Sequence, residues 1–385
     1  CPETLMSAET IFANARIVLR GEVVDGSVAV ADGVITAIDS GATAAPGALD
    51  LGGALLIPGL IELHTDNMEK HLVPRPGVLW PAPVAALLAH DLQIAGAGIT
   101  TVYDAITIGE YHENDLRRRI LADSVAAVTT ARARGLLRAD HLIHMRCEIS
   151  DPAVIEMAAP YADNPLVRLV SLMDHTPGQR QWRDISKMVQ YNKLENWSDE
   201  RLRAHVDERL QRQAVHSGPN RRRILEMFRP RGLPLASHDD TLVNHVDEAV
   251  ADGVTISEFP TTHEAATAAR AKGMKIVMGA PNVVRGGSHS GNVSATELAG
   301  EGLLDGLSSD YVPASLLQSA ILLERNIGMP LNETVALVSA NIADMLGLGD
   351  RGEIAVGRRA DLVQVELADT VPVVRSVWRE GARVC

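Results

Sequence analysis

Two hydrophobic patterns divide the chain. Near both ends, short runs of alternating apolar and polar residues are separated by turn signals such as Asp32-Gly33 and Gly357-Arg358. These runs cover residues 11–20, 22–31 and 34–39 at one end, and 354–356, 361–366 and 371–380 at the other. A period of two is typical of half-buried strands. We therefore predict a small β-sandwich lobe built from residues 8–57 and 350–385.

Between these ends, short apolar runs are followed by segments of helical length. Strands are predicted over residues 59–66, 99–105, 141–149, 167–175, 233–239, 254–259, 275–280 and 303–310. Helices are predicted over residues 83–95, 115–134, 198–217, 241–251 and 263–272. Eight βα units indicate a TIM-like (β/α)₈ barrel over residues 58–349, with a doubly wound parallel sheet as the alternative.

The amino-acid composition indicates a globular protein and argues against several other classes of protein. The 385 residues are 46% hydrophobic and 22% charged, as in ordinary globular proteins. Only 3% are aromatic, and 36 basic against 49 acidic side chains give a net charge of −13, which argues against nucleic-acid binding. No apolar run approaches the length of a membrane span, and the three cysteines form no disulfide framework. We expect a cytoplasmic protein with no membrane partner.

Histidine and carboxylate side chains stand where the predicted strands end. Alternation along the first strand places His64 and Asp66 on one face, with Ile61 and Leu63 on the other. Parallel barrel strands end at one face, where active sites lie. The predicted metal ligands are His64, Asp66, Glu148, His175, His238 and Asp310. Nitrogen and oxygen ligands of this kind suit Zn²⁺, with Mn²⁺ or Fe²⁺ as alternatives, and suffice for two ions if Glu148 bridges them.

Three segments resemble the amidohydrolase superfamily of metal-dependent hydrolases. They are residues 50–64, in which Pro58-Gly59 precedes the first metal-binding His, residues 341–348 and residues 352–363. The resemblance implies a metal-assisted hydrolase. Asp66 stands where the superfamily usually has a second His, and Glu148 substitutes for its usual carboxylated lysine. The paired histidines fall on strands four and five rather than five and six.

Within this superfamily, the motifs are most similar to those of the diphosphatases of bacterial phosphonate use. The segments that carry this resemblance are 62–67, 71–76, 173–181, 257–262, 278–292 and 307–311. It implies hydrolysis of a sugar 5-triphosphate to the 5-phosphate and diphosphate. The substrate would be a phosphorylated small molecule, and weak association with other proteins of phosphonate use is an accompanying hypothesis. A homodimer is the default expectation for the assembly.

Hydrolysis of a triphosphate would require further residues with defined roles. A bound divalent ion lowers the pKa of water to about 7, so that metal-bound hydroxide can attack the phosphoanhydride, and Asp310 would accept the proton. Cations would stabilise the leaving diphosphate. The predicted substrate-binding residues are Arg75, Arg146, Arg180, Arg183, Lys187, Arg285 and Ser288. His289, in the Gly- and Ser-rich loop 286–292, would donate a proton to the leaving group or bind a phosphate. Arg146 is equally suited to an ion pair with Glu148.

Two other functions remain open. The same fold could hydrolyse C–N bonds in a cyclic amide, an N-acyl amine or a purine, or could be a non-catalytic scaffold subunit. Neutral cyclic amides need few arginines, and the intact ligand set argues against a scaffold. The run Arg221–Arg223, which follows Gly218-Pro219, is predicted to begin a separate helix and to lie on a solvated face.

Overall fold

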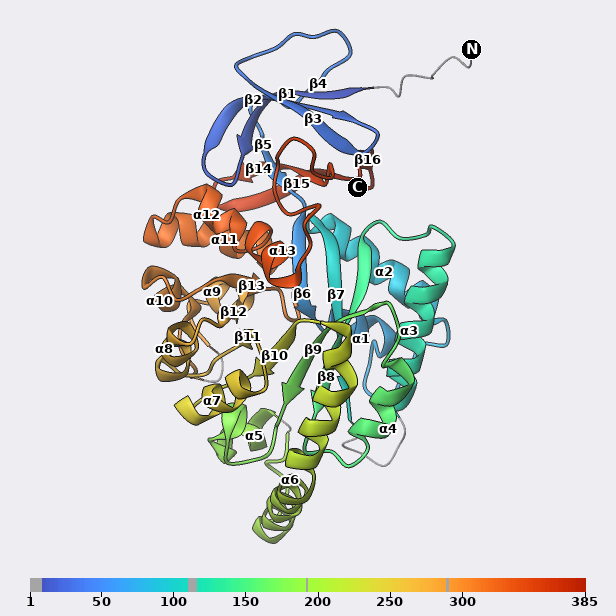
Figure 1. Cartoon of the computed structure of the whole chain (residues 1–385), viewed down its shortest axis with the longest axis vertical. Helices are drawn as coiled ribbons and strands as arrows, with labels where there is room; N and C mark the ends of the chain where they lie inside the picture. Colours follow the sequence, from blue (N-terminus) through green and yellow to red (C-terminus); the bar gives the residue numbers. More distant parts are fainter. Residues whose placement is uncertain (1–8, 110–115, 192, 289–290) are drawn as a thin grey trace.

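The computed structural model describes residues 9–109, 116–191, 193–288 and 291–385. It contains a small, mostly antiparallel β lobe stacked on a larger barrel, with both described chain ends in the lobe (Figure 1). The strands of the lobe are β1 (Thr10–Val18), β2 (Val23–Ala31), β3 (Val34–Ser40), β4 (Leu49–Asp50), β5 (Leu55–Pro58), β14 (Leu362–Ala368), β15 (Val371–Arg379) and β16 (Ala382–Arg383). The prediction of a lobe made from both chain ends is confirmed.

Hydrogen bonds join the lobe strands into one sheet rather than two separate ones. Its order is β16-β15-β14-β5-β1-β2-β3, with the short β4 paired to β1. Phe12, Ile17 and Trp378 belong to its buried core, and the rings of Phe12 and Trp378 meet edge to face at 4.8 Å. Since β14 pairs with β5, the sheet can be completed only after the chain between them has been made.

The second sheet is a parallel barrel of eight strands in sequence order. They are β6 (Leu60–Thr65), β7 (Ile99–Ile108), β8 (Asp140–Glu148), β9 (Val167–Met173), β10 (Leu235–His238), β11 (Ile256–Glu258), β12 (Lys275–Gly279) and β13 (Gly306–Ser308). A parallel bridge between Thr65 and Asp310 joins the first strand to the last. The predicted barrel and all eight of its strands are therefore confirmed, and the described residues contain no further barrel strand.

Helices surround the barrel in the described part of the chain. They are α1 (Asn67–Leu72), α2 (Pro83–Gly96), α3 (Leu116–Ala133), α4 (Val154–Ala158), α5 (Ile185–Tyr191), α6 (Asp199–Phe228), α7 (Val243–Ala251), α8 (His263–Ala271), α9 (Ala280–Val284), α10 (Ala295–Gly300), α11 (Ser315–Ile327), α12 (Leu331–Ala336) and α13 (Ala340–Leu346). Single 3₁₀ turns occur at η1 (Ala159–Tyr161), η2 (Arg180–Trp182) and η3 (Arg229–Arg231). None of the described helices combines the length and apolarity that a membrane crossing requires.

Apolar side chains of the barrel strands alternate between the two faces of the sheet as predicted, except in β6. Ile143, Met145 and Cys147 of β8 pack in the cluster that includes the surrounding helices. Ile61 and Leu63, however, join side chains of other barrel strands and of α13 in a separate cluster. The prediction that they face away from the barrel interior is wrong. Register shifts in β6, one of them between Glu62 and Thr65, interrupt its period of two.

The end of the predicted helix 198–217 is also wrong, because α6 continues through Pro219 to Phe228. Tertiary contacts beyond the proline hold the second half in place. Ile224, Leu225 and Phe228 are buried, and Asn220 donates hydrogen bonds to the carbonyl oxygens of Ile149 and Asp151 at 3.0 and 2.9 Å. Burial of this apolar face outweighs the backbone hydrogen bond lost at proline.

The solvated face predicted for Arg221–Arg223 is likewise wrong for Arg221. Its side chain is buried and forms ion pairs with Glu248 at 2.7 Å and with Asp252. Arg222 and Arg223 are exposed. The basic run thus stands inside one continuous helix, where successive residues point in different directions.

Candidate metal centre

Polar side chains converge at the ends of five barrel strands. His64 and Asp66 come from the end of β6, Glu148 from β8, and His238 from β10. His175 and Asp310 lie just beyond the ends of β9 and β13. The bridge that closes the barrel lies here too, since the amide of Asp66 and the hydroxyl of Thr65 donate to the carbonyl oxygen of Asp310 at 3.1 and 2.6 Å.

Two histidines share a carboxylate on one side of the centre. Nε2 of His175 lies 3.6 Å and Nε2 of His238 lies 3.5 Å from Oδ2 of Asp239. On its other side, the ring of His175 places Nδ1 2.8 Å from Oε2 of Glu148. Glu148 and His238 are buried, and His175 is partly exposed. His175, His238 and Asp239 can therefore offer converging ligand atoms.

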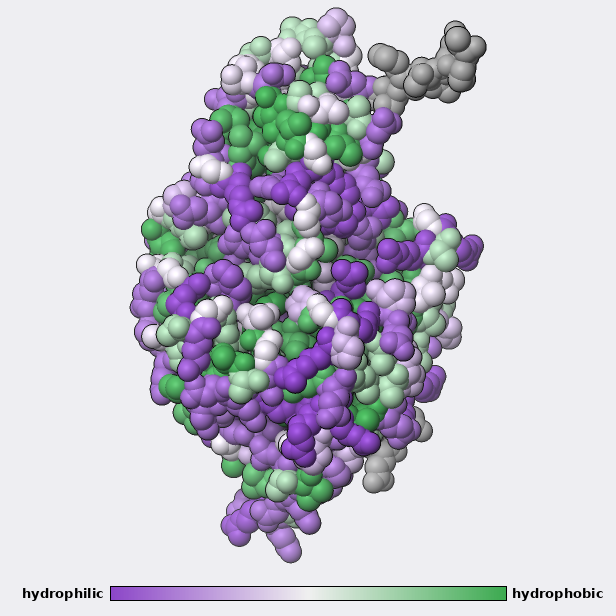
Figure 2. Space-filling model, in the orientation of Figure 1, coloured by the Kyte–Doolittle hydropathy of each residue, from purple (hydrophilic) through white to green (hydrophobic). Residues whose placement is uncertain are grey.

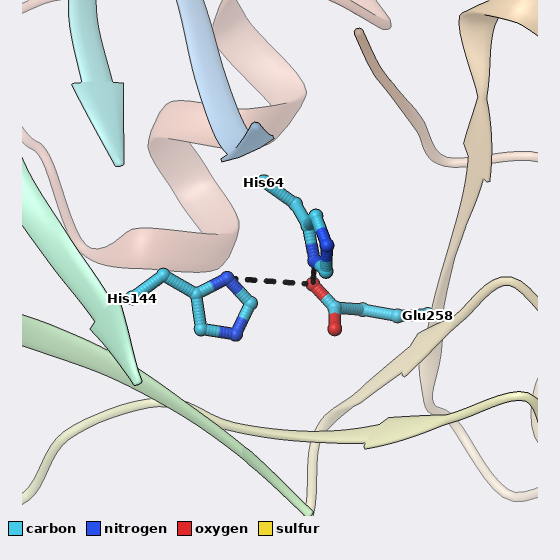
Figure 3. A group of neighbouring side chains, drawn as sticks. All are labelled: His64, His144 and Glu258. Atoms are coloured by element: carbon cyan, nitrogen blue, oxygen red, sulfur yellow. Dashed lines mark hydrogen bonds and ion pairs between the residues drawn. The ribbon is translucent and has the colours of Figure 1, made fainter. Parts of the chain in front are cut away.

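Glu258, at the end of β11, contacts the Nδ1 atoms of two imidazole rings and so orients both rings. Its Oε1 lies 3.1 Å from Nδ1 of His64, and its Oε2 lies 3.3 Å from Nδ1 of His238. Figure 3 shows the carboxylate of Glu258 between His64 and His144, whose Nδ1 is 3.8 Å away. His144 is engaged by the carbonyl oxygen of Leu63 and the hydroxyl of Ser171, each at 3.0 Å. Glu258 thus leaves Nε2 of His64 and His238 turned toward the centre.

Asp66 and Asp310 interact electrostatically with Arg146, and the charge of Asp66 acts on Asp310. Burial raises the pKa of Asp310, and the nearby charge of Asp66 adds to it, bringing the pKa to about 7. Burial also raises the pKa of Asp66, whereas the positive charge of Arg146 acts against the shift at both carboxylates. Nε of Arg146 is buried without a hydrogen-bond partner, and no ion pair between Arg146 and Glu148 is found within the described chain. The positive charge of Arg146 therefore stabilises the ionised forms of the two carboxylates, Asp66 and Asp310.

The histidines differ in their electrostatic surroundings. Burial lowers the pKa of His238 to about 3 and puts that of His64 well below its usual value, so both imidazoles are neutral. Burial also lowers the pKa of His175, but the charge of Glu148 and hydrogen bonds to Asp239 and Glu148 outweigh it and raise the pKa to about 9. Two neutral rings and several carboxylates are suitable metal donors.

The residues present fit a divalent metal ion. Two polar atoms that face this region, Nε2 of His64 and Oδ1 of Asp66, are buried without hydrogen-bond partners. An unpartnered buried polar atom is costly, and a cation would satisfy both. Strand-end backbone is also unusual, because Asp239, Phe259 and Asp310 adopt φ values of 56°, 55° and 54°. Left-handed conformations of this kind are commonly retained at functional sites.

The structure brings the six predicted ligands together at the strand ends, whereas the predicted substrate-binding residues differ in their exposure to solvent. Arg75, Arg183 and Arg285 are exposed, whereas Ser288 is half-buried. Arg180 is buried and binds Oδ1 of Asp240 at 2.7 Å and the carbonyl oxygen of His238 at 3.0 Å, so that it braces the end of β10. His289 lies outside the described residues.

Lys187 lies against the Gly- and Ser-rich loop. Its Nζ is 2.5 Å from the position that a Cβ atom on Gly291 would occupy. Gly291 also has a φ of 74°. Glycine is therefore required at this point for two reasons, the backbone conformation and the close approach of the lysine.

Asp239 and Glu258 were not among the predicted site residues. Both stand at strand ends, as the predicted ligands do, and Glu258 follows Ser257 in a segment that carries the resemblance to the diphosphatases. The signal was present in the sequence. Their roles could not be predicted, because each role follows from the imidazole nitrogen that the carboxylate contacts. Those contacts are set by the three-dimensional arrangement of the strands.

Comparisons with known proteins agree with this geometry. Residues 55–384 match the model of the amidohydrolase family. The chain is 45% identical, over 97% of its length and 100% of the relative, to the α-D-ribose 1-methylphosphonate 5-triphosphate diphosphatase of Escherichia coli. It is 26% identical to the imidazolonepropionase of Deinococcus deserti, over 94% of this chain and 92% of the relative.

Solved structures show the same fold at lower identity. The 5-methylcytosine deaminase of Klebsiella pneumoniae superposes with a TM-score of 0.67 at 16% identity, over 98% of this chain and 97% of that chain. The N-acetylglucosamine-6-phosphate deacetylase of Pasteurella multocida gives a TM-score of 0.61 at 13% identity, over 98% and 99%. With its barrel, its strand-end ligands and a family match over most of its length, the chain belongs to the amidohydrolase family.

Proposed function

We propose that this protein is a metal-dependent diphosphatase that hydrolyses α-D-ribose 1-methylphosphonate 5-triphosphate to the 5-phosphate and diphosphate. The observation that carries the proposal is the convergence of His64, Asp66, Glu148, His175, His238 and Asp310 at one end of the barrel. Near full-length identity of 45% to a diphosphatase with this substrate supports the choice of bond.

The ligand-type residues would hold one or two ions, for which Zn²⁺ is our choice from the donor set. A divalent ion there supplies Lewis-acid activation of water and of phosphoryl oxygens. Asp310 accepts the proton of the attacking water at a carboxylate oxygen. Arg146 donates N–H groups to phosphoryl oxygen on which charge accumulates. Glu258 keeps Nδ1 of His64 and His238 engaged, so that each Nε2 would be available to hold an ion.

A C–N hydrolase is the competing function, since imidazolonepropionase is also a full-length relative at 26% identity. The position of Arg146 favours the diphosphatase. The buried Nε of Arg146 has no hydrogen-bond partner and can donate to an oxygen of a phosphorylated substrate, whereas a neutral amide offers fewer acceptors to it.

We propose a cytoplasmic location, because the described cysteines, Cys147 and Cys385, are free thiols. Homodimer formation and weak association with other proteins of phosphonate use accompany this proposal and call for direct measurement of mass in solution. A small-molecule substrate agrees with a site enclosed by strand ends.

The test is phosphorus NMR of the metal-loaded protein with the 5-triphosphate, beside a sample treated with EDTA. Metal-dependent appearance of diphosphate is expected. Asp310→Asn and His238→Ala should abolish turnover while the circular dichroism spectrum stays unchanged, whereas His263→Ala, on the exposed surface, should be fully active. Absence of diphosphate from a protein shown to contain metal would redirect the assignment to C–N substrates.

A further inference from the structure

A lysine lies one helical turn beyond the predicted ligand Asp66. α1 begins at Asn67, directly after Asp66, and Lys70 is the fourth residue after Asp66. Residues four apart are neighbours on the surface of a helix. Since α1 follows the end of β6, Lys70 lies at the end of the barrel where the predicted ligands converge. Its side chain is exposed and thus presents a positive charge to solvent beside the candidate metal centre.

Contacts with Tyr311 hold the ammonium group of Lys70 in place. Nζ donates a hydrogen bond to the carbonyl oxygen of Tyr311 and lies 5.1 Å from the centre of its ring. Tyr311 directly follows Asp310, whose carbonyl oxygen accepts a hydrogen bond from the amide of Asp66 at 3.1 Å. The ammonium group is therefore tethered next to the point where the barrel closes. A side chain that is already held loses less entropy when it binds a ligand.

The charge of Lys70 acts on the same two carboxylates as the charge of Arg146. Burial raises the pKa of Asp66 and of Asp310, and both cations oppose this rise at both carboxylates. Interactions between charges near solvent fade beyond about 10 Å at physiological salt. A phosphoryl group whose attacking water gives its proton to Asp310 therefore comes within the range of Lys70 as well as of Arg146.

The ammonium group of Lys70 retains a donor for a ligand. It has three N–H bonds, of which the carbonyl oxygen of Tyr311 takes one. No other hydrogen bond or ion pair of Lys70 occurs among the described residues. Even if a second N–H is directed at the ring of Tyr311, the third is left for an oxyanion. The neighbouring Glu69 does not compete for it, because its Oε2 lies 2.5 Å from Nη1 of Arg117.

We propose that Lys70 is a substrate-binding residue that donates a hydrogen bond to a phosphorus oxyanion next to the bond that is hydrolysed. This inference rests on the proposed function for the identity of the substrate. Two groups flank that bond, the 5-phosphate that stays on the ribose and the diphosphate that leaves. Both carry non-bridging oxygens that accept hydrogen bonds from an ammonium group. Lys70 holds the oxyanion on the solvent side of the centre, while Arg146 reaches it from the partly buried side.

The kinetic experiment compares Lys70→Met and Lys70→Arg with Lys272→Met. Methionine keeps the apolar stem of Lys70 against Tyr311 but removes the charge and the donors, whereas arginine keeps both. Lys272 is the matched control, because it is also exposed but lies between α8 and β12, at the end of the barrel where the strands begin.

Loss of the hydrogen bond should appear mainly in KM. For Lys70→Met we expect KM for the triphosphate to rise about tenfold to a hundredfold, as for loss of one charge-assisted hydrogen bond, with a much smaller change in kcat. Lys70→Arg should recover most of the loss, and Lys272→Met should stay within about twofold of the unmodified protein. A fall in kcat with KM unchanged, in a Lys70→Met protein with an unaltered unfolding temperature, would overturn the proposal.

Binding of the products identifies the group that Lys70 holds. Titration calorimetry of diphosphate, and separately of ribose 1-methylphosphonate 5-phosphate, is performed on metal-loaded protein in buffer with the same free metal concentration. Weaker binding of one product to Lys70→Met than to Lys272→Met supports the proposal and names the group. Unchanged binding of both products, in a protein that still hydrolyses the triphosphate, overturns the role of Lys70 but not the proposed function. Lack of hydrolysis by the unmodified protein, with product binding that still depends on Lys70, overturns the function alone.

Discussion

At the scale of single residues, Glu258 determines how two histidines face the centre. It is completely buried, and its two oxygens engage Nδ1 of His64 and of His238. Glu258→Gln keeps the shape of the side chain but replaces one acceptor by a donor. We expect metal affinity to fall by roughly tenfold to a hundredfold, as for loss of other partners of ligating histidines. Competition with a chromogenic chelator measures this affinity directly.

The surface pair of His263 and Glu301 provides a control of the same chemistry. Both side chains are about half exposed, so Glu301→Gln should leave metal affinity unchanged. Equal affinities for Glu258→Gln and Glu301→Gln would contradict the orienting role of Glu258. A collapse of the thermal unfolding transition in Glu258→Gln alone would instead indicate a purely structural role.

A second group of buried ionisable residues lies between β7, β8 and α2. The carboxylate of Asp104 is 2.8 Å from Nε2 of His90 and 2.8 Å from Nδ1 of His141, and Nε2 of His141 is 3.3 Å from Oδ1 of Asp91. Burial lowers the pKa of His141, but the charge and hydrogen bond of Asp104, with those of Asp91, raise it to about 9. His141 is therefore protonated in the folded protein at neutral pH.

This shift predicts a pH dependence of stability. The pKa of His141 is higher in the folded protein than the value of about 6.5 in an unfolded chain. Its contribution to the free energy of unfolding is thus complete below pH 6.5 and is lost as the pH rises through 9. Urea unfolding at pH 6, 7.5 and 9 should show a decline that is smaller in His141→Gln, in which His175, whose pKa is also raised to about 9, still contributes, while His263→Gln, on the surface, retains the full decline. Parallel declines in all three proteins would refute the assignment.

The ligand positions could be predicted because each is a local feature, a His or carboxylate immediately after an apolar run. The true strands end one or two residues before several predicted limits, and His175, Asp239 and Asp310 stand in that gap. Hydrogen-bond partners could not be predicted in the same way. The register between the paired strands β7 and β8 brings Asp104 and His141 together. His64 and Glu258 come from β6 and β11, which do not pair, and closure of the barrel brings these two together.

At the scale of elements, α6 shows that residue propensities alone do not determine where a helix ends. Gly218-Pro219 predicts a helix end, and the second half is retained only because its apolar face is buried against the barrel. The first half lacks such burial and depends on polar contacts, chiefly those of Asp174 with Gln213 and Ser217. The two halves of one helix should therefore differ in local stability.

Asp174→Asn tests this difference. The variant keeps the size of the side chain but weakens its acceptor capacity toward α6. We expect faster amide hydrogen exchange in residues 199–217, with exchange in residues 220–228 unchanged because that half is anchored by the core. Asp207→Asn, exposed on the same helix, is the control and should exchange as the unmodified protein does. Uniform acceleration along the whole helix would contradict two independently anchored halves.

At the scale of the whole molecule, charged residues connect the lobe to the end of the barrel where its strands begin. Asp140, at the start of β8, binds Nη1 of Arg351 at 2.7 Å and Nη1 of Arg359 at 2.6 Å. Arg359 also pairs with Asp361, beside β14. Figure 2 shows a band of hydrophilic residues at this junction, below the apolar surface of the lobe. The hydrophobic patterns predicted the lobe and the barrel. They could not predict the ion pairs between them, because Asp140 and its arginine partners are more than two hundred residues apart in the sequence.

Asp140→Ala should therefore uncouple the parts without unfolding either core. Two arginines that are largely buried would lose a shared partner, and since Asp140 is about one-third exposed, we expect a loss of about 2 kcal/mol, between the values for buried and for surface pairs. Calorimetry should show a lower transition temperature, with a smaller difference from the unmodified protein at 1 M NaCl, because salt screens the interaction that the variant lacks. Asp39→Ala, on the exposed side of the lobe, should melt as the unmodified protein does. If Asp140→Ala melts at the same temperature as Asp39→Ala at low salt, the lobe is held by its continuous backbone and apolar contacts alone, and the ionic junction contributes nothing to the assembly of the two parts.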